Sequence, residues 1–584
     1  MLYYSAEKGV QMIISLLKAN GIRKVVASPG ATNITMVASL QHDPFFEMYS
    51  CVDERAAAYM ACGLSEESGE PVVLSCTGAT SSRNYMPALT EAYYRHLPIL
   101  VITSSQDKSR LGHLIPQVTD REHHASDVLV KSVHLQTIKD YQDEWDCNVK
   151  INSAIIALKQ HGGGPSHINL TTQYNGDYSV QEIPGERKVT YYNYTTDLPE
   201  LPKGRIAIFI GSHSKMTAQQ TEIIDNFCAA NNAVAFCDHT SNYRGKYMVC
   251  NGILGLQDNC RFDLHNVDLL IHVGGMSGSY FASDRLNAKA VWRVSTDGKY
   301  CDHYAKLTGL FEMNKFDFFK HYTPKGSANN DSYLTECLTA VENSWSIVKD
   351  LPFSNWWLSK TIGTQIPENS VIHFGILNSL RSWNAFPLTR SVSAYCNVGG
   401  FGIDGAVSTL LGASLVHKEK LYFGVMGDLA FFYDLNSMGN RHFANNVRIL
   451  LVNNGCGIEF RNYNHQGAKF GEDTNKYIAA GGHFGHQSPI FVKHIAEDMG
   501  FEYISASSKE EFLEMSKRFL NPEMYPKPIL FEVFTDPNDE SEAFRLVANT
   551  VVDESLVMKK KIKGTIKSII GEDAAKSILH IFKK

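Results

Sequence analysis

Two apolar runs in the last third of the chain decide its fold: LYFGVMGDL at residues 421–429 and VRILLVNNG at residues 447–455. Each run has the length of a strand and ends abruptly in small and polar residues. A helix-length segment separates them, so the pattern predicts two parallel strands joined by a helical crossover. Asp428 and Asn454 then fall directly after their strands, at the sheet edge where ligand sites form in such folds.

The same alternation occurs in the first third of the chain. Apolar runs at 24–27 and 71–76 end in Ser28-Pro29-Gly30 and Thr77-Gly78, and a run at 46–51 precedes Glu54. Further runs lie at 98–103 and 167–170, and a middle section has runs at 206–210, 233–237 and 269–273. This pattern predicts parallel, doubly wound sheets, with the quoted polar residues at strand carboxyl ends.

We therefore predict an α/β protein with three doubly wound parallel-sheet domains and a C-terminal helical tail. The predicted ranges are 1–185, 186–345, 346–545 and, for the tail, 546–584. Residues 183–202, rich in Pro and Tyr, are predicted to be a linker, and 329–331 form a polar junction. A chain of 584 residues exceeds what one hydrophobic core usually supports.

Composition narrows the class of protein. With 44% hydrophobic and 20% charged residues the chain is typical of globular proteins, and a net charge of −6 gives no signal for nucleic acid. Its 12 Cys residues form no CxxC pair, which is typical of reduced, intracellular proteins. The start lacks the pattern of a secretion signal, and no apolar stretch reaches the ~20 residues that span a bilayer. We expect a cytoplasmic protein that does not bind nucleic acid.

Asp428 and Asn454 suit a hard divalent cation. Mg²⁺ prefers oxygen ligands in octahedral geometry. The Asp428 carboxylate, the Asn454 amide oxygen and a backbone carbonyl at Cys456 would supply such ligands, with phosphate oxygens and water completing the shell. Gly427 lets the backbone approach a phosphate, and the next helix presents its N-terminus to it.

Glu54 has two interpretations. Asp53 and Glu54 precede a helix, where the helix dipole favours anions without any chemistry. Alternatively, desolvation in a half-apolar pocket raises the pKa of a glutamate at a strand end, so that it can take part in proton transfer. The motifs at Asp428 and Asn454 favour the second interpretation.

The chain resembles the thiamine diphosphate decarboxylase superfamily, in pyrimidine, middle and diphosphate domain order. Within it, the chain is most similar to the 2-succinyl-5-enolpyruvyl-6-hydroxy-3-cyclohexene-1-carboxylate synthases of menaquinone synthesis, which share Leu429 in place of the usual third Gly. The resemblance covers about residues 1–540 and is weakest in the middle domain. It is carried by Ser28-Pro29-Gly30, Asp53-Glu54-Arg55, PALTEA at 87–92, GIDG at 402–405, Gly427-Asp428-Leu429 and YDLN at 433–436.

The resemblance implies a cofactor, a metal and roles for particular residues. The cofactor would be thiamine diphosphate with Mg²⁺, in an active site of a homodimer or homotetramer that takes Glu54 from one chain and Asp428 from another. Glu54 would activate the cofactor, Gln117 would contact the reacting centre, and Ile403 would bend the cofactor. The implied catalytic residues are Glu54, Gln117 and His113, and the metal ligands Asp428, Asn454 and Cys456. The cofactor-binding residues are Ser28, Pro29, Gly30, Thr77, Gly78, Asn397, Gly402, Ile403, Gly427, Leu429 and Asn453.

The substrate pocket departs from this resemblance. Thr32, Gln106 and Val398 stand where the synthases carry Arg. Trp383 stands at a further such position, although Arg381 is close to it. Paired Arg–carboxylate contacts are strong and depend on geometry. Their joint loss argues against isochorismate, the acceptor of the synthases.

The predicted function is that of a carboligase, which decarboxylates a 2-oxo acid and transfers the resulting acyl-anion equivalent to an acceptor. A simple decarboxylase that releases an aldehyde, with His113 or His124 as proton donor, is the first alternative. An acetolactate-synthase-like enzyme is another, although the middle domain shows no FAD signature. A catalytically inactive cofactor-binding scaffold is the alternative from a different class. The 2-oxo acid donor and the acceptor remain open.

Three further features have open interpretations. His483 and His486 lie in a Gly-rich run that is either a mobile lid or a zinc pair, and two His alone make a poor zinc site. Gly162 to Gly164 indicate a turn. The tail from Lys559 onward has a basic amphipathic pattern, typical of a helix that packs on its own domain, on a partner subunit or, as a peripheral contact, on a membrane.

Overall fold

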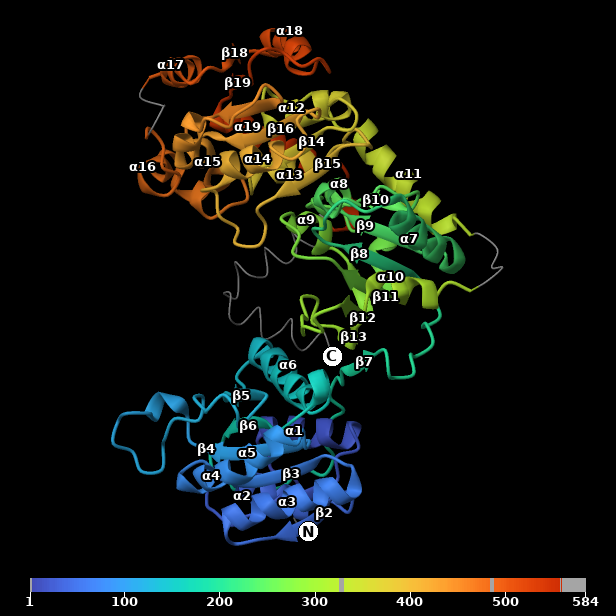
Figure 1. The fold of residues 1–584 in the computed structure, drawn as a ribbon, viewed down its shortest axis with the longest axis vertical. Coiled ribbons are helices and arrows are strands. Elements are labelled where there is room, and N and C mark those ends of the chain that lie inside the picture. The colour runs from blue at the N-terminus through green and yellow to red at the C-terminus, as the bar shows by residue number, and fades with distance from the viewer. Residues whose placement is uncertain (1–2, 325–329, 484–487, 557, 559–584) are drawn as a thin grey trace. The chain divides into compact units, whose positions relative to one another are not determined.

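The computed structural model describes residues 3–324, 330–483, 488–556 and 558. The chain forms two compact units, one from residues up to Pro199 together with Val291–Met313, the other from Glu200–Ala290 and the residues from Asn314 on. Three sheets, in which every recorded strand pair is parallel, carry the fold and confirm the predicted α/β class (Figure 1). The predicted tail from Lys559 onward lies outside the described residues.

The first sheet lies in the first unit and has the strand order β2-β1-β3-β4-β6-β5. The order reverses direction between β1 and β3, which makes their carboxyl ends the topological switch point where ligands bind in such sheets. The strands are β1 (Lys24–Ala27), β2 (Glu47–Ser50), β3 (Val72–Thr77), β4 (Ile99–Ser105), β5 (Lys131–Leu135) and β6 (Ser166–Thr171).

Helices cover both faces of this sheet. Alternate strand residues pack in opposite directions, as the two-residue period of a strand requires. Val25 and Val73 contribute to a core with α1 (Lys8–Ala19) and α6 (Tyr141–Ala157). Val26, Leu74 and Val101 contribute to a second core with α3 (Glu54–Ser68) and α5 (Met86–Tyr94). Burial on both faces explains why the central strands have continuous apolar runs.

The middle sheet has strands in both units. The second unit holds the order β10-β9-β8-β11, and the first holds β12-β13-β7, with the division falling inside β12. The strands are β7 (Thr190–Asn193), β8 (Ile206–Ile210), β9 (Val234–Cys237), β10 (Met248–Cys250), β11 (Asn266–Val273), β12 (Asn287–Ser295) and β13 (Leu307–Glu312). The prediction that 183–202 is only a linker is wrong, because it contains β7. That strand is half-buried throughout and so has no apolar run to reveal it.

The third sheet repeats the order of the first, as β15-β14-β16-β17-β19-β18. Its switch point therefore lies between β14 and β16, and Asp428 follows β16 directly. The strands are β14 (Val371–Phe374), β15 (Ser393–Cys396), β16 (Tyr422–Gly427), β17 (Val447–Asn453), β18 (Glu502–Ala506) and β19 (Ile529–Phe534). Each sheet's strands fall inside one predicted domain range, but the exact boundaries stay a prediction.

The other helices connect these strands. None of the helices in the described ranges combines the length and the apolar content that a membrane crossing needs. They are α2 (Ile34–Gln41), α4 (Thr80–Asn84), α7 (Ala218–Asn231), α8 (Gly252–Gly255), α9 (Tyr280–Ser283), α10 (Lys315–His321), α11 (Ser332–Ser346), α12 (Asn355–Ile362), α13 (Asn378–Asn384), α14 (Ala406–Ser414), α15 (Asp428–Tyr433), α16 (Thr474–Tyr477), α17 (Phe491–Asp498), α18 (Lys509–Phe519) and α19 (Pro537–Ala548).

Candidate active site

At the switch point of the first sheet, neighbouring chain segments pack tightly against two glycines. A Cβ atom added at Gly30 would lie 1.9 Å from the Cγ2 atom of Thr77, and one added at Gly78 would lie 2.7 Å from the Cβ atom of Ser105. Glycine is therefore required where the segments after β1, β3 and β4 meet. The predicted cofactor-binding runs Ser28-Pro29-Gly30 and Thr77-Gly78 are thus brought together in one place.

Glu54 is the first residue of α3, and Asp53 is the residue that caps this helix. The Asp53 carboxylate accepts hydrogen bonds from the backbone N–H groups of Arg55 (2.9 Å) and Ala56 (3.3 Å). Half-buried Glu54 instead accepts a hydrogen bond from the Asn84 side chain, at 3.2 Å. Because Asp53 already satisfies the helix terminus, the Glu54 carboxylate is left for another role.

Gln117 and His113, the other predicted catalytic residues, form no hydrogen bond or ion pair with Glu54 among the described residues. Both lie on the exposed loop after β4, and within the described ranges neither side chain makes a hydrogen bond. Gln117 has a φ of 65°, an uncommon conformation for a residue other than glycine. Their catalytic roles stay predictions.

Of the two adjacent histidines, His124 is held inside the first unit and His123 is exposed. His123 pairs with Asp120 at 2.7 Å. The His124 Nε2 atom lies 2.7 Å from the Arg121 carbonyl oxygen, and its ring meets the edge of His167 with centroids 5.1 Å apart. Burial lowers the pKa of His124, so its imidazole is predominantly neutral near pH 7. These contacts restrain His124 and do not favour a proton-shuttling role.

His167 predicts a pH dependence of stability. It is fully buried between the hydroxyl oxygens of Thr103 (2.7 Å) and Ser132 (2.9 Å), and burial lowers its pKa to about 3. An unfolded histidine has a pKa of about 6.5. Between these values the unfolded chain binds more protons, so the stability present above about pH 6.5 is lost as pH falls.

We expect His167→Gln to remove this pH dependence. In urea unfolding, lowering the pH from 7 to 5 should cost the wild type about 2 kcal/mol more than the variant. Exposed His113→Gln is the control and should behave as wild type. Equal pH dependence in wild type and His167→Gln would contradict the assignment.

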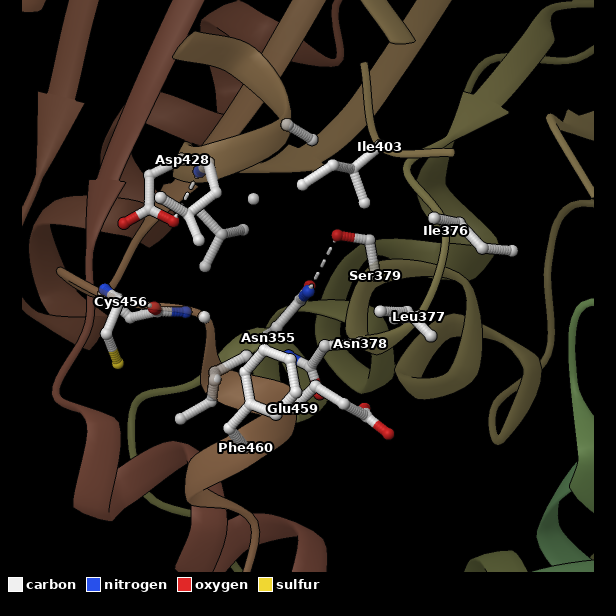
Figure 2. A pocket seen from close by; sticks show the side chains of 17 residues that line it. Asn355, Ile376, Leu377, Asn378, Ser379, Ile403, Asp428, Cys456, Glu459 and Phe460 are labelled. Atoms are coloured by element: carbon white, nitrogen blue, oxygen red, sulfur yellow. Dashed lines mark hydrogen bonds between the residues drawn. The ribbon is translucent and has the colours of Figure 1, made fainter. Parts of the chain in front are cut away.

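A second group of predicted residues lines a cavity of about 100 Å³ in the second unit. The cavity lies at the carboxyl ends of β14, β16 and β17, at the switch point of the third sheet. Figure 2 shows Asp428 and Cys456 on one side of it, with Ile403 and Ser379 opposite. The cavity thus collects the predicted metal ligands and the backbone around Gly427, where a diphosphate is expected.

Asp428 and Asn454 present oxygen atoms to this cavity. The Asp428 side chain is 2% exposed and accepts hydrogen bonds from the backbone N–H groups of Leu429 (2.8 Å) and Gly455 (2.9 Å). Asn454 and Cys456 are also buried and line the same cavity. A fixed carboxylate beside an amide oxygen is a donor set that fits Mg²⁺ with a diphosphate.

The other predicted residues near this cavity differ in placement. Half-buried Ile403 lines it, as do Gly427 and Leu429. Asn397 donates hydrogen bonds to the Gly405 carbonyl (3.2 Å) and the Thr409 hydroxyl (3.0 Å), beside the Gly402-Ile403 run. The Asn453 side chain is directed elsewhere and donates a hydrogen bond to buried Glu532, at 2.7 Å.

Several residues that form the rest of the cavity wall were not predicted from the sequence. Leu377, at the N-terminus of α13, has a φ of 70°, and Asn355 donates a hydrogen bond to Ser379 at 3.5 Å (Figure 2). A leucine at positive φ is strained, and such strain gathers at functional sites. This backbone conformation is visible only in the structure, because a leucine in the sequence does not indicate a positive φ.

Glu540 was also not predicted. It does not line the cavity, but it binds residues that form or adjoin the cavity wall. It is fully buried, and its Oε1 atom accepts hydrogen bonds from the Asn355 N–H (2.9 Å) and the Thr535 hydroxyl (2.8 Å). Burial raises its pKa to about 7, although hydrogen bonds from Asn355, Thr535 and Asn378 oppose that rise. Glu540 therefore connects α19 to the first residues of α12 and α13.

The residues at the expected Arg positions make contacts of their own. The Thr32 hydroxyl donates to the Ser104 carbonyl at 2.5 Å, and Gln106 accepts a hydrogen bond from Arg110 at 2.6 Å. Val398 is 7% exposed, and Trp383 is buried and donates to the Asn355 side chain at 3.0 Å.

Arg381, close to Trp383 in the sequence, is a buried cation that already has a partner. It pairs with Glu459 and lies over the ring of Tyr280, 4.5 Å from its centroid. The structure thus shows no unpaired arginine at these positions in the described part of the third sheet's domain.

The zinc interpretation of the Gly-rich run stays a prediction, because only one of its two histidines belongs to the described residues. Within the described ranges no group of three or more His, Cys, Asp or Glu residues is placed to hold a metal. His483 belongs to those ranges, whereas His486 lies outside them. Gly162 ends a short 3₁₀ turn, as the turn prediction implied.

Known proteins resemble this chain along most of its length. The family described as "Thiamine pyrophosphate enzyme, N-terminal TPP binding domain" matches residues 7–127. The 2-succinyl-5-enolpyruvyl-6-hydroxy-3-cyclohexene-1-carboxylate synthase of Bacteroides thetaiotaomicron is 30% identical over 93% of this chain and 98% of the relative. The synthases of the same name from Bacteroides fragilis and Porphyromonas gingivalis are 29% and 26% identical, over 93% and 92% of this chain and 98% of each relative.

Solved structures include a similar chain as well. It is the thiamine diphosphate-dependent 4-hydroxybenzoylformate decarboxylase of Rhodococcus jostii RHA1, with 16% identity and a TM-score of 0.38. The match covers 90% of this chain and 99% of the decarboxylase.

Proposed function

The chain belongs to the 2-succinyl-5-enolpyruvyl-6-hydroxy-3-cyclohexene-1-carboxylate synthase family of thiamine pyrophosphate enzymes, and from this premise we propose that it is a Mg²⁺-dependent carboligase. It would decarboxylate a 2-oxo acid and transfer the resulting acyl-anion equivalent to an acceptor. The observation that carries this proposal is the joint placement of Asp428 and Asn454 in one cavity at a sheet switch point. That placement suits the metal-bound diphosphate of the cofactor.

The chain's own residues have distinct roles in this proposal. Asp428, Asn454 and the backbone carbonyl of Cys456 would hold Mg²⁺, and Ile403 would press against the cofactor. Bound thiamine diphosphate would supply a carbon nucleophile and a cationic thiazolium ring that accepts the electron pair left by loss of CO₂. Glu54 would exchange a proton with the aminopyrimidine ring. This role is open to it because its half-buried carboxylate takes no part in capping α3.

The test supplies the protein with Mg²⁺, thiamine diphosphate and a panel of 2-oxo acids, with and without candidate acceptors. We expect CO₂ release, and a product whose mass equals the decarboxylated donor plus the acceptor. An aldehyde as the only product would identify a simple decarboxylase instead. Absence of CO₂ release across the panel, with cofactor binding intact, would favour the inactive scaffold.

Isochorismate is expected to be a poor acceptor. Thr32, Gln106 and Val398 replace charged anchors, and each lost charge-assisted hydrogen bond typically costs about 1.5–3 kcal/mol. We expect kcat/KM for isochorismate with 2-oxoglutarate to be at least about 100-fold below that of the best acceptor found. Product formation is measured by mass spectrometry, with donor decarboxylation in the absence of acceptor as the control. Efficient synthesis from isochorismate would show that other residues bind its carboxylates.

Glu540 is proposed as a positioning residue for the cofactor cavity. Glu540→Ala removes the acceptor for Asn355 and Thr535, so we expect cofactor affinity to fall by about tenfold, or about 1.4 kcal/mol. Glu540→Gln keeps an acceptor oxygen and should restore most of that affinity. The control is Glu542→Ala, at a half-buried position on the same helix whose carboxylate pairs with Arg545 and does not line the cavity. Equal affinity in Glu540→Ala and wild type, measured by calorimetry on folded protein, would refute this role.

A further inference from the structure

A second cavity, of about 400 Å³, lies at the opposite end of the strands that carry the cofactor cavity. Val371, Ser393 and Tyr422, which begin β14, β15 and β16, are aligned with one another and line it. It therefore opens at the amino ends of these strands, whereas Asp428 follows the carboxyl end of β16. All its lining residues belong to the second unit.

The floor of this cavity consists of aromatic side chains on one face of the sheet. His373 is paired with Tyr395 in the strand register, and their ring centroids lie 5.3 Å apart. Tyr422 belongs to the same face through its pairing with Val371. Such a floor offers flat apolar surface against which a planar ring can stack.

His373 provides a buried polar atom that the protein does not satisfy. Its side chain is 8% exposed, and within the described ranges the Nε2 atom has no hydrogen-bond partner. Leaving a buried polar atom unsatisfied typically costs about 1–3 kcal/mol, so the atom needs an explanation. The Nε2 atom itself is closed to solvent, so His373 contributes to the cavity through the accessible part of its ring.

The rim of the cavity carries positive charge. Lys215 and Lys420 line it, and neither forms an ion pair with any residue that the structure describes. His417, which also lines the cavity, lies 3.4 Å from the Glu419 carboxylate, so that carboxylate is directed to the His417 ring. Two uncompensated ammonium groups beside a cavity attract an anion with more than one negative charge.

The type of cationic side chain at the rim limits the class of anion that the cavity can bind. Arginine favours planar, bidentate recognition of carboxylates, whereas lysine acts as a point charge and is a common phosphate binder. Among the described residues, no arginine lines this cavity. Its volume falls in the range of about 300–1,000 Å³ that is typical of small-molecule sites.

We propose that this cavity is a second ligand site, which binds a phosphate monoester carried on a planar ring, such as an aryl phosphate or a nucleoside monophosphate. The phosphate lies between Lys215 and Lys420. The ring lies on half-buried Tyr395, beside the ring of His373. The site is separate from the cofactor cavity and does not depend on the proposed reaction.

Calorimetry on protein saturated with Mg²⁺ and thiamine diphosphate tests the proposal, because the diphosphate cavity is then filled. The probes are phenyl phosphate, AMP, inorganic phosphate and benzoate. We expect phenyl phosphate or AMP to bind one per chain, at least about tenfold more tightly than inorganic phosphate and benzoate. Which of the two binds more tightly distinguishes an aryl phosphate from a nucleotide.

Variants locate the binding. The double variant Lys215→Ala with Lys420→Ala should weaken it by about tenfold or more, and His373→Phe by a few fold. The control is Lys418→Ala, which removes an exposed lysine of the same loop that does not line the cavity. The lysine variants lie at the rim and leave the core unchanged, so they test the site even where His373→Phe fails to fold.

Three results would overturn the proposal. The first is that ring-bearing phosphates bind no more tightly than inorganic phosphate. The second is that the double lysine variant binds as wild type does. The third is that raising the thiamine diphosphate concentration displaces the probe, which would place the probe in the cofactor cavity.

Discussion

Glu54→Gln is expected to lower kcat by about 10²–10⁴, the usual contribution of a positioned proton-transfer group. The substitution is nearly isosteric, and an amide oxygen can still accept the hydrogen bond from Asn84. Fold and cofactor affinity should therefore be preserved while turnover is lost. The measurements are circular dichroism, calorimetry with thiamine diphosphate and the rate of CO₂ release.

The neighbouring residue provides a matched control for this variant. Asp53 caps α3 through two backbone N–H groups, so Asp53→Asn should change stability by at most about 1 kcal/mol and leave kcat close to wild type. If Glu54→Gln retains more than about a tenth of the wild-type rate, a loss below about 1.4 kcal/mol, then Glu54 does not activate the cofactor.

How much of the fold the sequence predicts depends on where a strand lies in its sheet. β16 and β17 are central, buried strands, and both lie inside the apolar runs at 421–429 and 447–455. Of the six edge strands, β5, β7, β10, β15 and β18 were not predicted, and only β2 was, by the run at 46–51. At least part of each unpredicted edge strand is exposed or half-buried, as in KSVHL and EYISA, so no continuous apolar run marks it.

The candidate site shows a similar division. Asp428, Asn454 and Ile403 were predicted from motifs, and the structure brings all three to one cavity. Asn453 was predicted with them, but consecutive strand residues point to opposite faces, and its side chain bonds to Glu532. Glu540 escaped prediction because its role depends on α12 and α19 meeting, which no local pattern in the sequence specifies.

Asp428→Ala is expected to weaken cofactor binding by at least about 100-fold, or about 2.7 kcal/mol, in the presence of Mg²⁺. The substitution removes the only charged ligand proposed for the metal, and Mg²⁺ should no longer increase the affinity. Calorimetry with and without Mg²⁺ measures both effects. Asp473→Ala, at an exposed carboxylate that does not line the cavity, should bind the cofactor as wild type does. An unchanged affinity in Asp428→Ala would disprove the metal assignment.

The two inactive variants together test whether two chains share one active site. In a dimer of one Glu54→Gln chain and one Asp428→Ala chain, a shared site would combine the intact Glu54 of one chain with the intact Asp428 of the other. One of its two sites would then be fully native and the other doubly impaired. Random mixing makes half of the dimers mixed, so activity should recover to about a quarter of wild type. If each site instead took both residues from the same chain, every site would lack one of them, and mixing after subunit exchange would restore no activity.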